Sequence, residues 1–242
     1  LDKVRTPEEL AAWEQRAKKI GDEPNTYVVE YKYDGLTVNL RYEGGFLISA
    51  ATRGDGSVGE VITRQVMTIP TVPLSIPYKG LLEVQGEGIM RLSQLEKYNE
   101  TADEPLKNAR NAAAGALRNL DPAETARRKL SLVCYGVGYK DGAPLTSHRE
   151  MLEFLRENHF PVSDFAVTAH SLDEVMAAVR EAEKNRDSLD FLIDGAVIKI
   201  DSYAVRERLG FTQKFPRWAV AYKFAAVEKT TTLLDVIWQV GR

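Results

Sequence analysis

The alternation of apolar and polar residues is most regular between Val28 and Tyr42, in the sequence VVEYKYDGLTVNLRY. Side chains alternate across a strand, so Val28, Glu30 and Lys32 share one face. A buried lysine needs a partner, and a face that carries Lys and Glu among apolar residues usually opens onto a site. The alternative is a surface hairpin with a solvated Lys-Glu pair, since structural ion pairs are common. We expect two strands around a tight turn centred on residues 32–35.

The same patterns predict further elements. A helix over residues 6–20 begins with Thr6 as cap, Pro7 in the first position and Glu9 completing a capping box, and Ser147 and Ser171 open similar boxes. The other expected helices cover residues 60–68, 92–101, 108–119, 148–158 and 172–184, and a short one starts at 121. The other expected strands cover residues 46–53, 81–89, 130–139, 162–168, 195–200, 219–224 and 231–239. Hairpins imply antiparallel pairing, so we expect an α+β fold with two packed antiparallel sheets and helices outside.

Composition narrows the classes of protein. The chain has 242 residues, 44% of them hydrophobic and 28% charged, which is ordinary for a soluble globular protein. The net charge of -3 means that any binding of DNA must come from a local basic patch or from parts not present in these residues. The single cysteine, Cys134, excludes an internal disulfide and a Cys-rich zinc site, and its apolar surroundings predict a buried thiol. Without a membrane-length apolar run or a signal peptide, we expect a cytoplasmic monomer with no membrane partner.

Three lysines on apolar strands suggest chemistry on an anion. An amine must be neutral to attack as a nucleophile, whereas a free lysine has a pKa of about 10.4. Neighbouring cations or desolvation lower that pKa, and Lys199 and Lys223 are candidate cations for Lys32. The alternative for either residue is a strand-end lysine whose head reaches water. A site that handles phosphate needs such positive charge.

A glycine pattern raises a competing interpretation. Residues 54–59 (GDGSVG) fit the G-x-G-x-x-G pattern of dinucleotide-binding folds. That fold requires a βαβ unit and an acidic residue about 20 positions further on, but residues 72–80 contain no acid and three prolines interrupt residues 70–77. We favour a turn that directs Arg53 toward a ligand.

The sequence Lys32-Tyr33-Asp34-Gly35 resembles the first motif of the covalent nucleotidyltransferases, which are the DNA ligases, RNA ligases and mRNA capping enzymes. Seven further stretches follow it in order: residues 51–56 (ATRGDG), 82–87 (LEVQGE), 108–115 (NARNAAAG), 135–138 (YGVG), 193–199 (IDGAVIK), 216–224 (PRWAVAYKF) and 239–242 (QVGR). Together they resemble the adenylation domain of a bacterial NAD-dependent DNA ligase over nearly the whole chain. The resemblance implies a nucleotidyltransferase, ATP-grasp-like fold.

The resemblance also implies a role for each matching residue. Lys32 would attack the α-phosphate of NAD, expel nicotinamide mononucleotide and become adenylated, with Asp34 orienting it. Glu30 would read the adenine edge, and Tyr135, otherwise a core aromatic, would stack on the ring. Arg53 and Glu87 would hold the ribose, and Lys199 and Lys223 would hold the phosphate. Glu87 and Asp194 would tune the reactivity of the lysine and bind Mg2+ or Mn2+. Arg110 and Arg118 would contact the nicked DNA. The alternative for the two arginines is a solvated helix face.

Three positions depart from the family pattern. Gln85 stands where arginine is common, Gly88 where a larger apolar residue is usual, and Ala109 where proline is usual. Gln85 removes a charge next to Glu87, which would weaken contacts to DNA or phosphate.

We expect residues 1–242 to be one adenylation domain excised from a longer ligase. The family's nicotinamide mononucleotide-binding domain would precede Leu1, and its oligonucleotide-binding, zinc-finger, helix-hairpin-helix and C-terminal domains would follow Arg242. Such a fragment is expected to bind adenine nucleotides or adenine-like inhibitors, to self-adenylate poorly and not to seal nicks.

Three other functions stay open from the residues. An ATP-dependent ligase or capping enzyme shares the first motif, although residues 108–115 resemble only the NAD-dependent branch. A nicotinamide-cofactor oxidoreductase rests on residues 54–59. A non-catalytic module that binds adenine nucleotides or DNA is the last, for which an intact Lys32 is poor support.

Overall fold

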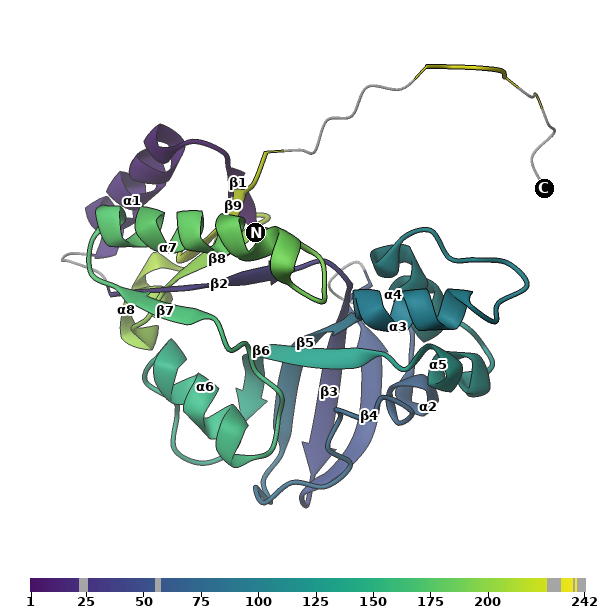
Figure 1. Cartoon of the computed structure of the whole chain (residues 1–242). Helices are drawn as coiled ribbons and strands as arrows, with labels where there is room; N and C mark the ends of the chain where they lie inside the picture. Colours follow the sequence, from purple (N-terminus) through teal and green to yellow (C-terminus); the bar gives the residue numbers. More distant parts are fainter. Residues whose placement is uncertain (22–25, 55–57, 226–231, 237, 239–242) are drawn as a thin grey trace.

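The computed structural model describes residues 1–21, 26–54, 58–225, 232–236 and 238. Its strands form two sheets, one of five strands in the order β1-β9-β8-β2-β7 and one of four in the order β4-β3-β5-β6 (Figure 1). The strands are β1 (Asp2–Val4), β2 (Tyr27–Tyr33), β3 (Leu36–Glu43), β4 (Phe46–Thr52), β5 (Leu82–Ile89), β6 (Ser131–Lys140), β7 (Ala166–Ala169), β8 (Ile193–Ile200) and β9 (Ala219–Lys223). The expected α+β class with two sheets is confirmed. Pairing within the described sheets is antiparallel apart from β1 with β9, which is parallel.

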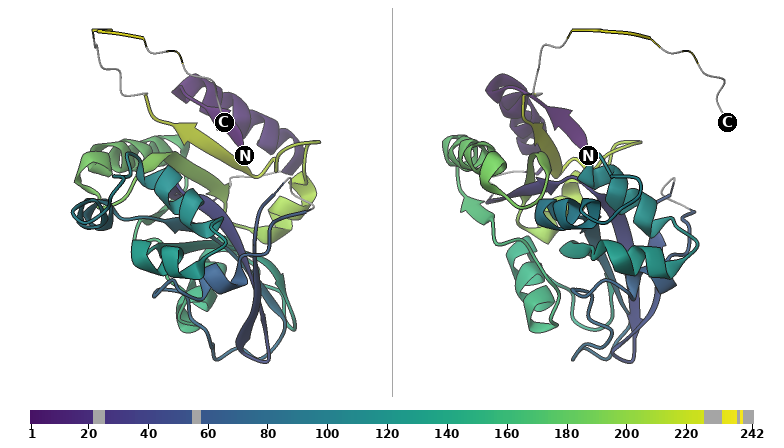
Figure 2. Two further views of the ribbon diagram at one scale, coloured as in Figure 1. Left: turned by 90° about the vertical axis from the view of Figure 1, so that its right-hand side faces the viewer. Right: turned by 45° about the vertical axis from the view of Figure 1, so that its right-hand side comes forward.

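Helices cover the outer surfaces of both sheets (Figures 1 and 2). They are α1 (Pro7–Gly21), α2 (Thr63–Val66), α3 (Leu92–Asn99), α4 (Ala109–Leu117), α5 (Pro122–Arg128), α6 (His148–Glu157), α7 (Leu172–Asn185) and α8 (Tyr203–Leu209), with a 3-10 turn at Arg186–Ser188. α1 and α7 pack on the five-stranded sheet, whereas α2, α4 and α6 contribute to the core of the four-stranded sheet. No helix in the described part of the chain is long and apolar enough to cross a membrane.

The apolar residues form two separate cores. One joins β3, β5 and β6 to α2, α4 and α6, and it includes Leu40, Leu117 and Leu155. The other lies between the five-stranded sheet and α1 with α7, and it includes Val29 and Ile198. Since side chains alternate along β2 and β8, the opposite face of the five-stranded sheet carries the intervening residues and turns toward β6 and α6. Of the predicted site residues, Glu30 and Lys199 lie on that face.

The expected hairpin between Val28 and Tyr42 is wrong. β2 pairs with β7 and β8, and β3 pairs with β4 and β5, so the chain passes from one sheet to the other at Asp34 and Gly35. The Asp34 amide donates to the carbonyl of Leu192 (3.0 Å), the residue directly before β8. This hydrogen bond holds the crossing segment against the five-stranded sheet. A Cβ on Gly35 would lie 2.2 Å from the Gly88 carbonyl oxygen, so only glycine fits there. Alternation indicates a strand but does not identify its partner.

Other boundaries also differ from the expectations. The predicted helix 60–68 is helical only at Thr63–Val66, because Glu60 and Val61 pair with the edge of β4. The predicted strand 162–168 begins at Ala166, and Val162 forms only an isolated bridge to Cys134. β1 and α8 were not predicted. Of the predicted strand 231–239, residues 232–236 and 238 form no strand, and 231, 237 and 239 lie outside the described residues.

The dinucleotide-binding interpretation of residues 54–59 is also unsupported by the fold. β4, the strand before the glycines, pairs antiparallel with β3, and no parallel crossover follows it among the described residues. Residues 55–57 lie outside the described part of the chain. The Cys134 thiol, by contrast, is fully buried and free as expected.

Candidate active site

Two of the predicted lysines share one carboxylate. The Lys32 Nζ lies 3.0 Å from Asp194 Oδ1, and the Lys223 ammonium donates to Asp194 Oδ2. The register between β2 and β8 shifts next to Lys32, and Lys223 stands opposite Gly195, so these strands place Asp194 between the two amines. The Lys32 side chain is 25% exposed and thus reachable from solvent.

The electrostatics of this group favour a charged Asp194. Burial opposes its ionisation, but hydrogen bonds and attraction from Lys223 and Lys32 outweigh burial and lower its pKa. Burial and the neighbouring Lys32 lower the pKa of Lys223, although Asp194 partly offsets them. Asp194 is therefore a negative charge held between the two lysines.

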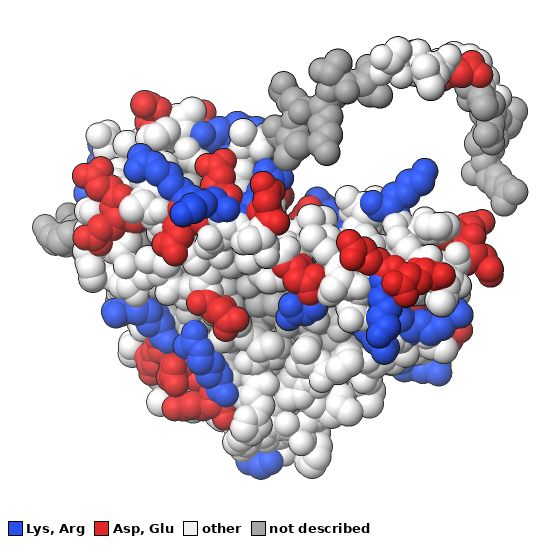
Figure 3. Space-filling view, viewed as in Figure 1, with Lys and Arg blue, Asp and Glu red and all other residues white. Residues whose placement is uncertain are grey.

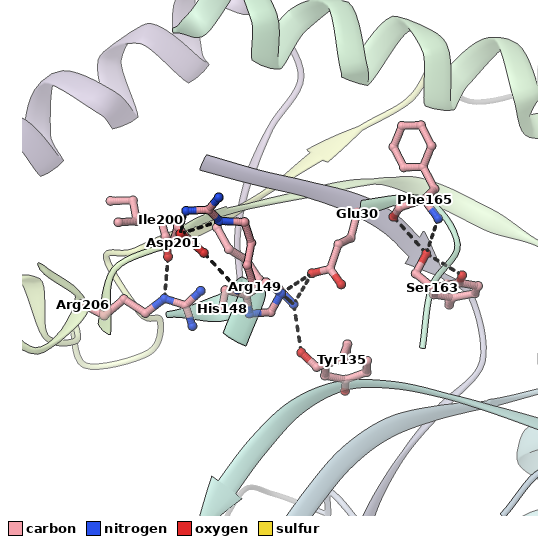
Figure 4. A network of polar contacts seen from close by, with 11 residues as sticks. Glu30, Tyr135, His148, Arg149, Ser163, Phe165, Ile200, Asp201 and Arg206 are labelled. Atoms are coloured by element: carbon pink, nitrogen blue, oxygen red, sulfur yellow. Dashed lines mark hydrogen bonds and ion pairs between the residues drawn. The ribbon is translucent and has the colours of Figure 1, made fainter. Parts of the chain in front are cut away.

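Glu30 and Lys199 lie on the same sheet face but form a second cluster with His148 (Figure 4). His148 Nε2 lies 2.7 Å from Glu30 Oε2, and Lys199 Nζ lies 2.7 Å from the same oxygen. The three residues are 2% (Glu30), 1% (His148) and 8% (Lys199) exposed. The alternative of a solvated Lys-Glu hairpin is therefore excluded for Glu30, whose cation is Lys199 and not Lys32.

The cluster contains one anion, one cation and a neutral ring. Burial opposes ionisation of Glu30, but Lys199 and His148 outweigh it and lower the pKa of Glu30 to about 2. Burial and the charge of Lys199 lower the pKa of His148 to about 4. Burial lowers the pKa of Lys199, against the attraction of Glu30. Glu30 Oε1 is buried without a hydrogen-bond partner, which leaves an acceptor free for a ligand.

His148 was missed from the sequence. It is the first residue of α6, and the capping box at Ser147 and Glu150 located that helix without indicating that its first residue reaches the other sheet. A lone histidine at a helix start carries no sequence signal for a site. Only the contact between α6 and the five-stranded sheet, where the His148 amide donates to the Asp201 carbonyl (2.9 Å), brings it to Glu30.

Tyr135 and Glu87 approach from the four-stranded sheet. The Tyr135 carbonyl accepts from Lys199 Nζ (3.1 Å), and this Nζ lies 5.4 Å from the centre of the Tyr135 ring. Thr37 Oγ1 donates to Glu87 Oε2 (3.2 Å), while burial raises the pKa of Glu87 to about 7. Arg53, exposed directly after β4, is close enough that its charge partly counters the burial that raises the pKa of Tyr135. The predicted adenine and ribose residues thus face one another from both sheets.

Arg110 and Arg118 each pair with an acidic residue, and only the partner of Arg110 belongs to the Lys32 motif. Arg110 Nη1 lies 3.0 Å from Asp34 Oδ1, and Arg118 Nε lies 3.5 Å from Glu60 Oε2. Both arginine side chains are more than half exposed. On the face shown in Figure 3, basic and acidic side chains are interspersed and form no continuous basic patch. Contact with DNA stays a prediction for both arginines.

A metal site made of protein side chains alone does not fit. Within the described ranges, no group of three or more His, Cys, Asp or Glu residues is arranged to hold a metal ion. Both oxygens of Asp194 face ammonium groups, which would compete with a cation. Mg2+ is commonly held by one or two carboxylates together with substrate phosphates. The metal assignment of Glu87 and Asp194 therefore stays a prediction, and we derive no step through a metal.

A separate apolar cavity of about 330 Å³ lies between α1 and the segment before β9. Trp13, Ile20, Phe215 and Pro216 are among the residues that line it, and none of the predicted site residues does. The lysine chemistry therefore belongs to the face between the sheets and not to this cavity.

Comparison with known proteins identifies the family. Residues 1–227 match the model of the NAD-dependent DNA ligase adenylation domain. The chain is 55% identical over 244 residues to a DNA ligase of Alkaliphilus metalliredigens (strain QYMF) and 56% identical over 245 residues to one of Alkaliphilus oremlandii (strain OhILAs). All of this chain is covered in both comparisons, and it spans 37% of the length of either relative.

Solved structures give a weaker likeness. An archaeal ATP-dependent RNA ligase (form 2) aligns over 93% of this chain and 48% of its own, with 15% identity and a TM-score of 0.49. The family match over residues 1–227 and the relatives aligned over the whole chain agree with each other. The chain therefore belongs to the adenylation-domain family of the NAD-dependent DNA ligases.

Proposed function

We propose that Lys32 takes AMP from NAD. The neutral amine attacks the α-phosphorus, a P–N bond forms as the P–O bond to nicotinamide mononucleotide breaks, and the amine releases a proton. The products are nicotinamide mononucleotide and a lysine phosphoramidate. The observation that carries this proposal is the pairing of Lys32 and Lys223 through Asp194 on one sheet face.

Each partner of Lys32 supplies part of the mechanism. Asp194 fixes the direction of the amine, and positioning of this kind lowers the entropic barrier to attack. Lys223 supplies positive charge where negative charge develops on the phosphate oxygens. Asp34, held by Arg110, orients the end of the motif and contacts the incoming phosphate or ribose region.

The adenosine half is proposed to lie between the sheets. Tyr135 stacks on the base, and Glu30 and Lys199 meet its edge. Arg53 and Glu87 hold the ribose. The burial of Glu30 and Lys199 supports this arrangement, since a buried ion pair with an unpartnered acceptor favours a polar ligand. Lys199 is then closer to the base than to the phosphate, which shifts its predicted phosphate role toward Lys223. We also infer a nucleotidyltransferase fold from the two sheets that flank this space.

The second half of the reaction concerns a ligase as long as the relatives. We propose that AMP passes from Lys32 to the 5′-phosphate of a DNA nick, with Arg110 and Arg118 on the DNA. These 242 residues alone are expected to adenylate slowly and not to seal nicks. Efficient sealing of nicked DNA by this chain with NAD would contradict that expectation.

Intact mass measurement after incubation with NAD and magnesium tests the proposal. We expect a gain of one adenylate that peptide mapping assigns to Lys32, and no gain with ATP. The variant Lys32→Arg keeps the charge but removes the nucleophile and is expected to give no adduct, whereas Lys97→Arg on exposed α3 is the matched control. An adduct that persists in Lys32→Arg would overturn the assignment.

A further inference from the structure

We propose that His148 is a positioning residue that sets the preference of the site for a base with a 6-amino group. This inference rests on the proposed adenine site and names the residue that maintains its specificity. His148 acts through Glu30: its imidazole holds one carboxylate oxygen, so that the other stays an acceptor for the base.

The geometry fixes the tautomer of His148. Nε2 lies 2.7 Å from Glu30 Oε2, and a carboxylate oxygen is only an acceptor, so Nε2 must carry the proton and donate. In the alternative tautomer Nε2 carries no proton and accepts from Lys199 at 3.4 Å. Nε2 and Glu30 Oε2 would then be two acceptors only 2.7 Å apart, which is unfavourable. Nδ1 is then a buried acceptor without a partner.

The ring is held rigidly in place. Ser147 and Ser202 form a bridge, and the His148 amide donates to the Asp201 carbonyl at 2.9 Å. Arg149, the next residue, donates from its amide to Asp201 Oδ1 at 3.0 Å and from its guanidinium to Oδ2 (Figure 4). The first turn of α6 is thus fastened to the five-stranded sheet, so the imidazole cannot follow Glu30 if the carboxylate rotates.

Glu30 and Lys199 present a fixed pattern to a base. The free Glu30 Oε1 accepts a hydrogen bond, and the Lys199 ammonium donates one. Adenine has a complementary edge, with an amino donor at position 6 and an acceptor at N1. Hypoxanthine has the reverse, with a carbonyl oxygen and an N–H. The pair therefore selects the 6-amino base, provided that Glu30 stays ionised.

His148 is needed because Lys199 has two tasks. In this structure, Lys199 and His148 both donate to Glu30 Oε2. The Lys199 ammonium has three protons, and one goes to the Tyr135 carbonyl, so a bond to N1 of the base leaves at most one for Oε2, whereas His148 stays on this oxygen. A buried carboxylate without a donor takes up a proton, and a protonated Glu30 would donate to the carbonyl of hypoxanthine. Loss of the His148 donor is therefore expected to reduce the preference for adenine over hypoxanthine more than it reduces the stability of the fold.

Binding of AMP and IMP by calorimetry tests this, with two matched variants. The amide nitrogen of glutamine reaches the place of Nε2, so His148→Gln keeps the donor, whereas asparagine reaches only the place of Nδ1. We expect His148→Gln to keep the wild-type ratio of the two dissociation constants. His148→Asn should lower the AMP preference by about tenfold or more, since a hydrogen bond to a charged group contributes about 1.5–3 kcal/mol. Equal ratios in the two variants would overturn the proposal.

Nitrogen NMR of the wild-type imidazole gives a test that does not depend on variants that fold. We expect a neutral ring protonated on Nε2 at pH 7, with a signal that AMP perturbs and IMP does not. A ring protonated on Nδ1, or a charged ring, would overturn the proposal. Adenylation of Lys32 by NAD separates the two hypotheses. If Lys32 is adenylated but the preference for AMP over IMP does not depend on His148, only this inference is wrong. If the preference depends on His148 but Lys32 is not adenylated, only the proposed nucleophile is wrong.

Discussion

Single residues in this site have properties that only their neighbours explain. Glu30 and Glu87 are both carboxylates between the sheets, yet the pKa of Glu30 is lowered to about 2 and that of Glu87 is raised to about 7. Glu30 has Lys199 and His148 within 2.7 Å, whereas Glu87 is hydrogen-bonded to the neutral Thr37 and is dominated by burial. Pairs of groups whose environments separate their pKa values are a mark of functional sites.

The buried histidine makes stability sensitive to acid. Its folded pKa of about 4 lies below the unfolded value of 6.5, so the unfolded chain binds the extra proton and stability falls as the pH drops from about 6.5 to 4. The charged groups that face it are Glu30 from β2, Lys199 from β8 and Arg206 from α8. We expect His148→Gln to lose less melting temperature over this range than the wild type. If the melting temperatures of the wild type and His148→Gln fall equally from pH 7 to pH 4, another group is responsible for the acid sensitivity.

The pKa of Glu87 is shifted in the opposite direction, so its effect on stability runs the other way with pH. Its folded pKa of about 7 exceeds the unfolded 4.5, so its contribution is full below pH 4.5 and is lost as the pH rises through 7. Glu87→Gln resembles the protonated acid. The variant is therefore expected to match the wild type in melting temperature near pH 4 and to exceed it at pH 8. Glu83→Gln on the exposed face of β5 is the control, and an equal effect in both variants would contradict the explanation.

At the scale of elements, three helices start with the same device. Thr6, Ser147 and Ser171 each accept from the amide three residues later, and the glutamate at that position accepts from the amide before the cap. The capping motif locates these helix starts in the sequence because all of its contacts are local. The predicted helix 60–68 has no such motif, and contacts with β4 decide its start instead.

Removal of a cap separates stability from function. Ser171→Ala is expected to cost about 1 kcal/mol of the free energy of unfolding and to leave AMP binding unchanged, because α7 packs on the outer face. Ser147→Ala should cost a similar amount and also weaken AMP binding, since the next residue is His148. Urea unfolding and calorimetry measure the two effects. Unchanged AMP binding in Ser147→Ala would argue against the link between α6 and the site.

At the scale of the molecule, the site exists because the chain joins two cores. β2 belongs to one sheet and β3 to the other, and the four residues of the Lys32 motif lie at the crossing between them. Lys199 with Tyr135, and His148 with Glu30, are polar contacts between the two halves. Burial of either core alone would not assemble these residues.

Gly35 is the point at which this crossing is most sensitive. The methyl group of Gly35→Ala would collide with the backbone oxygen of Gly88, 2.2 Å away, and β3 and β5 would have to separate. We expect a loss of several kcal/mol of the free energy of unfolding, at the upper end of single-residue effects (about 3 kcal/mol or more). Gly138→Ala, whose added Cβ meets only ordinary contacts at 3.6 Å or more, should have little effect in the same urea titration.

The sequence alone determined what depends on local spacing and motif content. It indicated the α+β class, three capped helices, the strands of Lys32, Lys199 and Lys223, and the family that the comparisons confirm. The tertiary structure decided which strands pair, so it separated β2 from β3, divided the lysines between Asp194 and Glu30, and brought His148 to the site. The reason is physical: periodicity fixes the face of a residue within its element, whereas contacts between residues as distant as Glu30 and His148 depend on how the two cores pack.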